Sequence, residues 1–375
     1  NATPNGNGSE KANGTVLVDG VGSQWVVKHN SIDNAATGML LGLNVGGQGS
    51  LTISGGSSVL LDATNGLVGA GDYVNIGQNG GKGALTVTGA GSSMVLARGG
   101  AIQAGRSNSA GGIVGEGSFS VLAGASASAT FLNVGRAGST GTTLIDGAGS
   151  QLVLSGMGQW SSGGIGPAGS IVGWGGSGQV TVANGALWRV TDGGTDTSTG
   201  PGSPAITVGD AGGNGKLFIQ SGSLVEILST SIGPGPGVAD NFNPYMAVGR
   251  SGGTGELTIN GGGRLLLTGN APVQAGSNRT TTLNIGGDSD TAAGGTGTVN
   301  VSGLGSEIRV AGADGLVIVG RNGNGTLSLS NQARVVVTGG GMNVGRAATG
   351  VGTLNVDNSF IELSGQFTSN ANSGA

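Results

Sequence analysis

Acidic residues and a single histidine are the groups in this sequence that could carry out catalysis. Two carboxylates at a suitable separation can hydrolyse a glycosidic bond, and a polysaccharide lyase needs a strong base. The 375-residue chain holds 19 acidic residues and one histidine, His29. The acidic residues are scattered through turns, with no stacked pair at one repeat position, and His29 lies in an irregular stretch near the N-terminus. We therefore predict no catalytic residue and interpret His29 as an ordinary loop residue.

One glycine-rich turn has the spacing of a metal loop. In Gly286-Gly287-Asp288-Ser289-Asp290 two carboxylates alternate, as oxygen ligands of Ca²⁺ often do. The tandem Gly-Gly-x-Gly-x-Asp nonapeptide of secreted β-roll proteins is absent, and an isolated Asp-x-Asp is more typical of a solvated turn. Cysteine is absent, which excludes disulfides and thiolate metal sites. We predict no metal site and no cofactor, and calcium binding by Asp288 and Asp290 stays open.

The strands that must position any such group recur with a period of about 34 residues. The clearest strand reads apolar, polar, apolar after a glycine-rich turn. Its eleven pairs of apolar positions are Val16/Val18, Leu51/Ile53, Leu85/Val87, Phe119/Val121, Thr143/Ile145, Val180/Val182, Leu217/Ile219, Leu257/Ile259, Val299/Val301, Leu327/Leu329 and Leu354/Val356.

Two further strands accompany each copy. One lies upstream and ends in a β-branched residue or alanine followed by glycine, as in Val45-Gly46, Ile76-Gly77, Val134-Gly135, Val248-Gly249, Ile285-Gly286, Val319-Gly320 and Val344-Gly345. The other follows, as at 93–96, 151–154 and 264–267. Three short strands per repeat fit one coil of a β-solenoid, in which like residues stack on like at about 4.8 Å. A sandwich would need hairpins and no even repetition.

We therefore predict an all-β, right-handed parallel β-helix of about eleven coils, roughly 50 Å long. Its 86 glycines serve corners, for which the clusters Gly80-Gly81, Gly175-Gly176 and Gly252-Gly253 are candidates. The predicted solenoid covers 15–363 as a single domain, between polar segments 1–14 and 364–375.

Polar residues also recur beside the upstream glycine. Asparagines that could form an axial amide ladder precede it at Asn44, Asn75, Asn133, Asn284 and Asn343. Arginines follow it at Arg106, Arg136, Arg250, Arg321 and Arg346. We interpret the arginines as solvated corner residues that keep the rod soluble, with an anion-binding stripe as the alternative.

Charge and hydropathy exclude several classes of protein. With 15 basic and 19 acidic residues there is no sequence-wide basic face for nucleic acid. No apolar run approaches the roughly 20 residues that cross a bilayer as a helix, and residues 1–14 lack a signal-peptide profile. A chain that is 36% hydrophobic with a formal charge of −4 can build a core and is not typical of disorder.

Four long insertions interrupt consecutive repeats. They leave the same corner of each coil and would stack into one decorated face, where solenoids commonly bind partners. Trp160, Phe242 and Tyr245 could stack there on a sugar ring or a partner, or could instead fold back over the rod. The insertions are Ser155 to Ser170, Thr191 to Ala205, Ser229 to Tyr245 and Gly269 to Thr282.

The segment from Val248 to Ile259, with parallel versions at Ile76 to Val87 and Val319 to Leu329, resembles the passenger-associated repeats of bacterial autotransporters and related large surface adhesins. The phrase Gly-Ala-Gly-Ser, at 89–92 and 147–150, carries the same resemblance. It covers nearly the whole chain and implies a right-handed β-helix on, or released from, a Gram-negative cell. Residues 364–375 lack the amphipathic strands of a membrane translocator, which leads us to expect a mature fragment or a piece of a longer polypeptide.

The sequence thus predicts a non-catalytic, secreted structural or adhesion rod at the bacterial cell surface. Its expected contacts are self-association through the solenoid ends, possible as head-to-tail filaments because neither end shows a cap, or binding of a host, cell-surface or glycan partner through the side loops. The alternative from another class is a polysaccharide-degrading β-helix enzyme of the tailspike or pectinase kind. A tight group of two or three carboxylates on one parallel face would favour that alternative.

Overall fold

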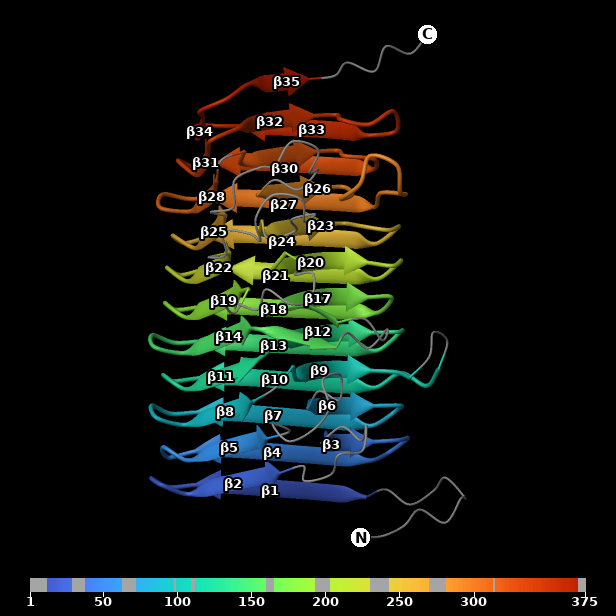
Figure 1. Ribbon diagram of the computed structural model, residues 1–375, viewed down its shortest axis with the longest axis vertical. Helices are drawn as coiled ribbons and strands as arrows, with labels where there is room; N and C mark the ends of the chain where they lie inside the picture. Colours follow the sequence, from blue (N-terminus) through green and yellow to red (C-terminus); the bar gives the residue numbers. More distant parts are fainter. Residues whose placement is uncertain are drawn as a thin grey trace, which may run out of the picture.

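The chain forms a parallel β-helix with right-handed crossovers, the sense that connections between parallel strands take in almost all proteins. Figure 1 shows the coils of this computed structural model stacked along one axis, with the N-terminus at one end and the C-terminus at the other. The structure describes residues 12–28, 38–62, 72–97, 99–108, 112–159, 165–192, 203–229, 243–269, 281–312 and 314–369. Across these residues there is no helix, and hence none long and apolar enough to cross a membrane.

The first of three 11-stranded sheets is built from the apolar-polar-apolar strands. Its registers pair every predicted position with its counterpart in the next coil, for example Val16 with Leu51 and Leu327 with Leu354. The eleven predicted copies and their alignment are confirmed. The strands are β1 (Asn13–Asp19), β4 (Gln48–Ser54), β7 (Lys82–Thr88), β10 (Glu116–Leu122), β13 (Thr140–Asp146), β18 (Ser177–Ala183), β21 (Asn214–Ile219), β24 (Thr254–Asn260), β27 (Thr296–Ser302), β30 (Asn324–Ser330) and β33 (Val351–Val356).

The second sheet contains the strands predicted downstream of each copy. They are β2 (Gln24–Lys28), β5 (Ser58–Asp62), β8 (Ser93–Leu96), β11 (Ser126–Ala129), β14 (Gln151–Ser155), β19 (Leu187–Thr191), β22 (Leu224–Ser229), β25 (Arg264–Gly269), β28 (Glu307–Ala311), β31 (Arg334–Thr338) and β34 (Phe360–Leu363). A short antiparallel hairpin, β15 (Met157–Gln159) with β16 (Ile165–Pro167), follows β14.

The third sheet carries the upstream strands. They are β3 (Gly38–Leu43), β6 (Tyr73–Gln78), β9 (Ala101–Arg106), β12 (Phe131–Arg136), β17 (Gly169–Trp174), β20 (Ala205–Asp210), β23 (Tyr245–Val248), β26 (Thr282–Ile285), β29 (Leu316–Val319), β32 (Gly341–Val344) and β35 (Phe367–Ser369). Among the described residues the first strand begins at Asn13 and the last ends at Ser369, so strands extend beyond the predicted solenoid limits of 15 and 363 at both ends. β35 counts as a strand because it pairs with β32.

The residue pair predicted to end the upstream strand of the first coil, Val45-Gly46, was wrong. Leu41 pairs with Ile76, so Leu41-Gly42, and not Val45-Gly46, is the equivalent of Ile76-Gly77. The turn after Gly42 is one residue longer than the turn after Gly77, and this shifted the apparent match. Asn44 and Val45 lie in that turn, and Val45 is exposed.

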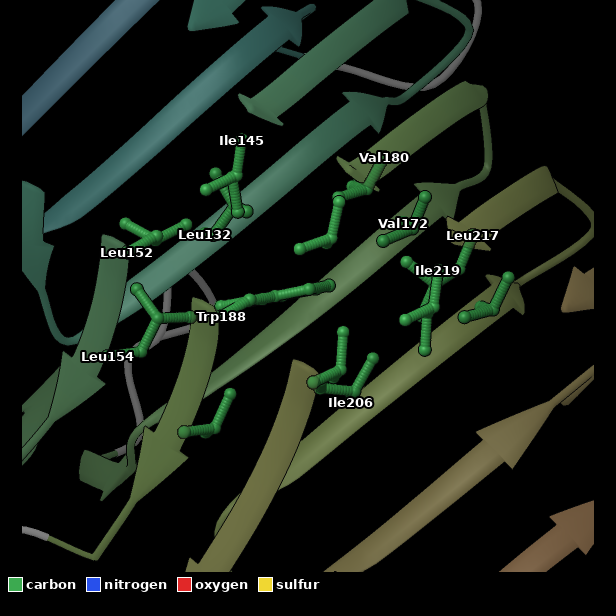
Figure 2. Packing of buried hydrophobic residues seen from close by; sticks show 14 of the residues in the cluster. Leu132, Ile145, Leu152, Leu154, Val172, Val180, Trp188, Ile206, Leu217 and Ile219 are labelled. Atoms are coloured by element: carbon green, nitrogen blue, oxygen red, sulfur yellow. The ribbon is translucent and has the colours of Figure 1, made fainter. Parts of the chain in front are cut away.

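One continuous core runs along the rod axis. Strand positions alternate inward and outward, and the inward ones are mostly Val, Leu, Ile, Met and Ala. Among the described residues, two fully buried inward positions hold large aromatic side chains, Phe119 and Trp188. Figure 2 shows the Trp188 side chain crossing the interior among aliphatic side chains such as Ile145, Leu154 and Val172, one from each sheet.

Two rows of glycine interlock at the corner where the third sheet of one coil meets the first sheet of the next. In the coil of β20, a Cβ atom on Gly209 would lie 2.1 Å from the carbonyl oxygen of Thr254, the first residue of β24. A Cβ atom on Gly255, also in β24, would lie 2.4 Å from the Gly249 nitrogen and 2.1 Å from the Val208 oxygen. Side chains are excluded here because backbone packs against backbone. Gly80, Gly175 and Gly252 lie in the adjoining turns, as predicted.

Replacing Thr143 by valine is expected to stabilise the rod. Thr143 is an inward residue of β13 stacked between Phe119 and Val180, and its buried hydroxyl has no hydrogen-bond partner in the structure. Removing an unsatisfied buried hydroxyl should raise the free energy of unfolding by about 1 kcal/mol. Thermal unfolding followed by circular dichroism measures this. Thr142→Val, on the exposed side of the same strand, is the control and should change stability by less than about 0.5 kcal/mol; an equal gain in both variants would contradict the explanation.

Candidate functional site

The outward face of the third sheet gathers most of the polar groups that the sequence singled out. Asn75, Asn133 and Asn284 point away from the core because they alternate with the inward residues of β6, β12 and β26. All three are nonetheless buried. These positions on the outward face of the sheet are therefore covered, unlike those of an ordinary solvated sheet surface.

The predicted asparagine ladder was wrong as an axial amide stack. Isoleucine, threonine and alanine interrupt the row between Asn133 and Asn284. Asn75 Nδ2 donates instead to Gln78 Oε1 in its own coil (2.9 Å), while the Oδ1 atoms of Asn75 and Asn133 are buried without a partner. The amides interact with groups at the end of the same sheet, and arginine is the commonest of those.

Arginines at the strand ends fold back over this layer. Arg321 Nη1 donates to Asn284 Oδ1 at 3.2 Å, and Arg136 Nη1 lies 3.5 Å from Gln103 Oε1, each in the preceding coil. Arg250 donates two hydrogen bonds to Asp210, at 3.2 and 2.9 Å, and one to Asp288 at 3.0 Å. The expectation that these arginines are solvated corner residues is wrong for Arg250 and Arg321, whose side chains are 24% and 14% exposed.

Asp288 and Asp290 lie in the loop between β26 and β27, and both face arginine. Asp290 forms ion pairs with Arg321 (2.9 Å) and Arg346 (3.1 Å), and Asp288 pairs with Arg250. A divalent cation at these two carboxylates would have to compete with three guanidinium groups. Within the described residues no cluster of three or more acidic or histidine side chains is placed to hold a metal. The geometry does not support the calcium interpretation.

A hollow of about 580 Å³ opens over β23, β26 and the β26–β27 loop, and reaches residues that flank β20 and β29. It combines hydroxyl, amide, carboxylate and guanidinium groups with one aromatic ring, a mixture suited to hydroxyl-rich ligands such as sugars. Tyr245, which the sequence placed in a loop, is the first residue of β23, and its hydroxyl lies 3.4 Å from Arg250 Nη1. The lining residues are Ser203, Asn243, Tyr245, Arg250, Thr282, Asn284, Asp288, Ser289, Asp290, Thr291 and Arg321.

Two carboxylates, Asp288 and Asp290, line this hollow, and the buried Asp210 lies behind Arg250, an arrangement that the sequence reasoning did not foresee. Arg250 bridges Asp210 and Asp288, and Arg321 holds Asp290. Asp210 was missed, although a signal existed: it follows Gly209 at the position that Arg250 occupies after Gly249. Desolvation raises the pKa of Asp290, but hydrogen bonds and charge from Arg321 and Arg346 outweigh it and lower that pKa overall. A lowered pKa keeps the Asp290 carboxylate ionised and unsuited to donating a proton as a general acid.

The lowered pKa of Asp290 gives a pH-dependent stability with a definite sign. Its contribution is fully present above the ordinary value of 3.8 and is lost as pH falls through the lower folded value. We expect the hydrogen-exchange protection factors of the β26–β27 loop, which compare each rate with the intrinsic rate at the same pH, to fall below about pH 4 in the wild type, modestly because Asp290 is partly exposed. Asp290→Asn should exchange faster at neutral pH and lack this acid step; an acid step of unchanged size in the variant would contradict the assignment.

The four predicted insertions do leave one corner, between the second and third sheets. They fall between β14 and β17, β19 and β20, β22 and β23, and β25 and β26. The chain also makes long connections at this corner between β2 and β3 and between β5 and β6, which sequence reasoning did not count. Trp160, Phe242 and His29 lie outside the described residues.

Two arginines nearer the N-terminus form a second polar cluster on the same sheet. Arg106 and Arg136 stack in register at the ends of β9 and β12. The guanidinium carbon of Arg136 lies 4.5 Å from the ring centroid of Trp174, the residue at the same position in the next coil. Burial lowers the pKa of both arginines, and for Arg136 the charge of Arg106 lowers the pKa further.

Comparisons with known proteins add little to this geometry. No protein-family model matches the chain, and no curated protein matches it. Among solved structures, it is similar to the crystal structure of a TibA fragment that is hyper-glycosylated by TibC, with 15% sequence identity and a TM-score of 0.23. The match covers 92% of this chain and 99% of that fragment. A TM-score this low carries no argument about fold or function, so the β-helix rests on the strand pairing described above.

Proposed function

We propose that this chain is a non-catalytic, extracellular adhesion rod of a bacterial surface, and that it binds glycans in the hollow over the third sheet. The supporting observation is the contrast between the hollow and the rest of the rod. The interior and the corners are fixed by axial pairing and backbone packing, whereas the hollow brings a tyrosine, two carboxylates and two arginines together without a core role. A rigid frame of this kind holds such groups in place at low entropic cost on binding.

A glycan array tests the proposal. The wild-type rod should bind one or more immobilised glycans, and Tyr245→Phe combined with Thr291→Ala should reduce that signal by about tenfold, since each change removes a hydroxyl at the hollow. Lys216→Gln is the matched control, because Lys216 lies on the outward face of the first sheet in an exposed ion pair with Glu256. Loss of binding in the control, or unchanged binding in the double variant, would count against the hollow.

The carboxylate group favours one alternative, polysaccharide hydrolysis. Asp288 and Asp290 line the hollow from the β26–β27 loop, and Asp210 pairs with the same arginine as Asp288; the sequence set a tight group of acids on one parallel face as the condition that would favour this alternative. Their pairing with arginine supports a binding role over catalysis, because a general acid needs a raised pKa. Incubation of the rod with each bound glycan, followed by an assay for new reducing ends, separates the two functions. Turnover that disappears in Asp288→Asn would establish the enzyme.

The proposal also includes association of the rods end to end. Apolar side chains stand exposed on the first and last coils that the structure describes, including Trp25 and Val26 at one end and Val356 and Phe360 at the other. The edges also carry unpaired backbone groups of three sheets, which another coil could continue. Light scattering and electron microscopy should show longer rods for the wild type and short ones for Leu354→Lys, with the outward neighbour Asn355→Lys as control. If the wild type formed nothing but short rods, end-to-end association would be excluded.

A further inference from the structure

The arginine row of the third sheet is neutralised in one half and not in the other. Arg250, Arg321 and Arg346 all have aspartate partners within 3.1 Å. Arg106 and Arg136 have no carboxylate partner among the residues that the structure describes. The Nε atom of Arg106 is buried and makes no hydrogen bond. A buried guanidinium donor without an acceptor is costly, since buried polar groups are almost always satisfied.

The surrounding sequence does not offer a counter-charge. From Tyr73 to Trp174 the chain contains two acidic residues, Glu116 and Asp146, against the four basic residues Lys82, Arg98, Arg106 and Arg136. Glu116 is paired with Lys82 at 2.8 Å, and Asp146 accepts a hydrogen bond from Asn184 at 2.7 Å. Both acids are therefore engaged with other partners on the first sheet.

The neighbours of the pair hold it in place without neutralising it. Trp174 covers one face of the Arg136 guanidinium, which leaves the N–H groups in its plane free to donate. Gln103 is a neutral acceptor 3.5 Å from Arg136 Nη1. Several stacked charges in neighbouring coils have opposite sign, as Lys82 and Glu116 or Arg189 and Glu226 do. Where Arg321 and Arg346 follow equivalent glycines in neighbouring coils, the Asp290 carboxylate pairs with both. Two like charges in register, both with lowered pKa, are unfavourable unless an anion bridges them.

From these contacts we infer that Arg106 and Arg136 form an anion-binding site for an oxyanion group of the sulfate type, separate from the hollow over β23 and β26. Stacked guanidinium groups present N–H donors to such a group in the bidentate geometry that arginine favours. The oxyanion can be a free ion or a substituent on an acidic polysaccharide. Both sources present the same oxyanion to the arginines. They differ in whether the sugar that carries the oxyanion is also needed for binding.

Isothermal titration calorimetry at constant ionic strength tests the site, with sodium sulfate, a heparin-derived hexasaccharide and the same hexasaccharide after desulfation as probes. The wild-type rod should bind sulfate, the sulfated hexasaccharide or both, and bind the desulfated sugar more weakly. Arg106→Gln and Arg136→Gln should each weaken binding by about tenfold or more. Arg136→Lys should give an intermediate loss, because lysine keeps the charge but not the planar fork.

Arg334→Gln is the control, since Arg334 pairs with Glu362 on the exposed second sheet and should not affect these affinities. Binding of both sulfate and the sulfated sugar would show that the group alone is recognised, and binding of the sugar alone would assign the source to a glycan. Circular dichroism verifies that each variant keeps the β-helix. Absence of binding by the wild type, an affinity of the two glutamine variants equal to that of the wild type, or an equal loss in Arg334→Gln would each overturn the inference.

Discussion

Replacing Gly209 by alanine is expected to open the corner between β20 and β24 and to destabilise the surrounding coils by about 3–5 kcal/mol. Gly209 has a φ of +75°, and an added Cβ atom would lie 2.1 Å from Thr254 O and 2.6 Å from Gly255 N. These are backbone atoms held in the sheet, so no side-chain rotation relieves the clash. Hydrogen exchange of β20 and β24 measures the effect, because stability in a repeat protein is set locally.

Gly212, three residues later, provides a matched control. Its φ of +76° is nearly the same, but no heavy atom lies within 4 Å of an added Cβ atom. Gly212→Ala should therefore show only the cost of a left-handed alanine, about 1–2 kcal/mol. If the two variants exchanged equally fast, the left-handed backbone conformation alone would explain the glycine row. The close packing of backbone against backbone at the corner would then not be its cause.

Trp188→Ala is expected to be the most damaging change in the core, lowering the free energy of unfolding by about 3–5 kcal/mol. Trp188 is fully buried in β19, between Leu152 and Val225 of the adjoining coils. Aliphatic neighbours surround the indole (Figure 2), so its removal leaves a cavity that rigid strands cannot close. Urea unfolding monitored by circular dichroism gives the magnitude.

Trp25 occupies the same row of the second sheet in the first coil, where it is 36% exposed. Trp25→Ala should cost clearly less than Trp188→Ala, because less surface returns to water and no closed cavity forms. Similar losses at the two positions would show that the centre of the rod is packed no more tightly than its first coil.

Much of the scaffold could be predicted from the sequence because stacking in register repeats the same side chain at the same level. Leu51, Leu85 and Phe119 occupy one row and share one buried environment, so the periodicity was visible without coordinates. The alignment failed at Val45-Gly46, where a one-residue longer turn produced a second match to the pattern. Local similarity cannot tell a strand end from a turn when glycine is this common.

The candidate site was harder to predict because it depends on axial neighbours of different type. Asp210 and Arg250 are 40 residues apart and form an ion pair because they follow successive glycines of one row. The sequence showed Asp288 and Asp290 as an isolated turn, since nothing local reveals that Arg250, Arg321 and Arg346 fold back onto them. The same alignment of post-glycine residues places Trp174 over Arg136.

The most direct test of the account is hydrogen–deuterium exchange of the rod with and without a glycan that binds it on the array. The account predicts added protection at β23 (Tyr245–Val248) and across Thr282 to Gly295, with the first and second sheets unchanged and the glycan intact after incubation. Protection confined to the first or second sheet, or a glycan shortened during the experiment, would contradict it.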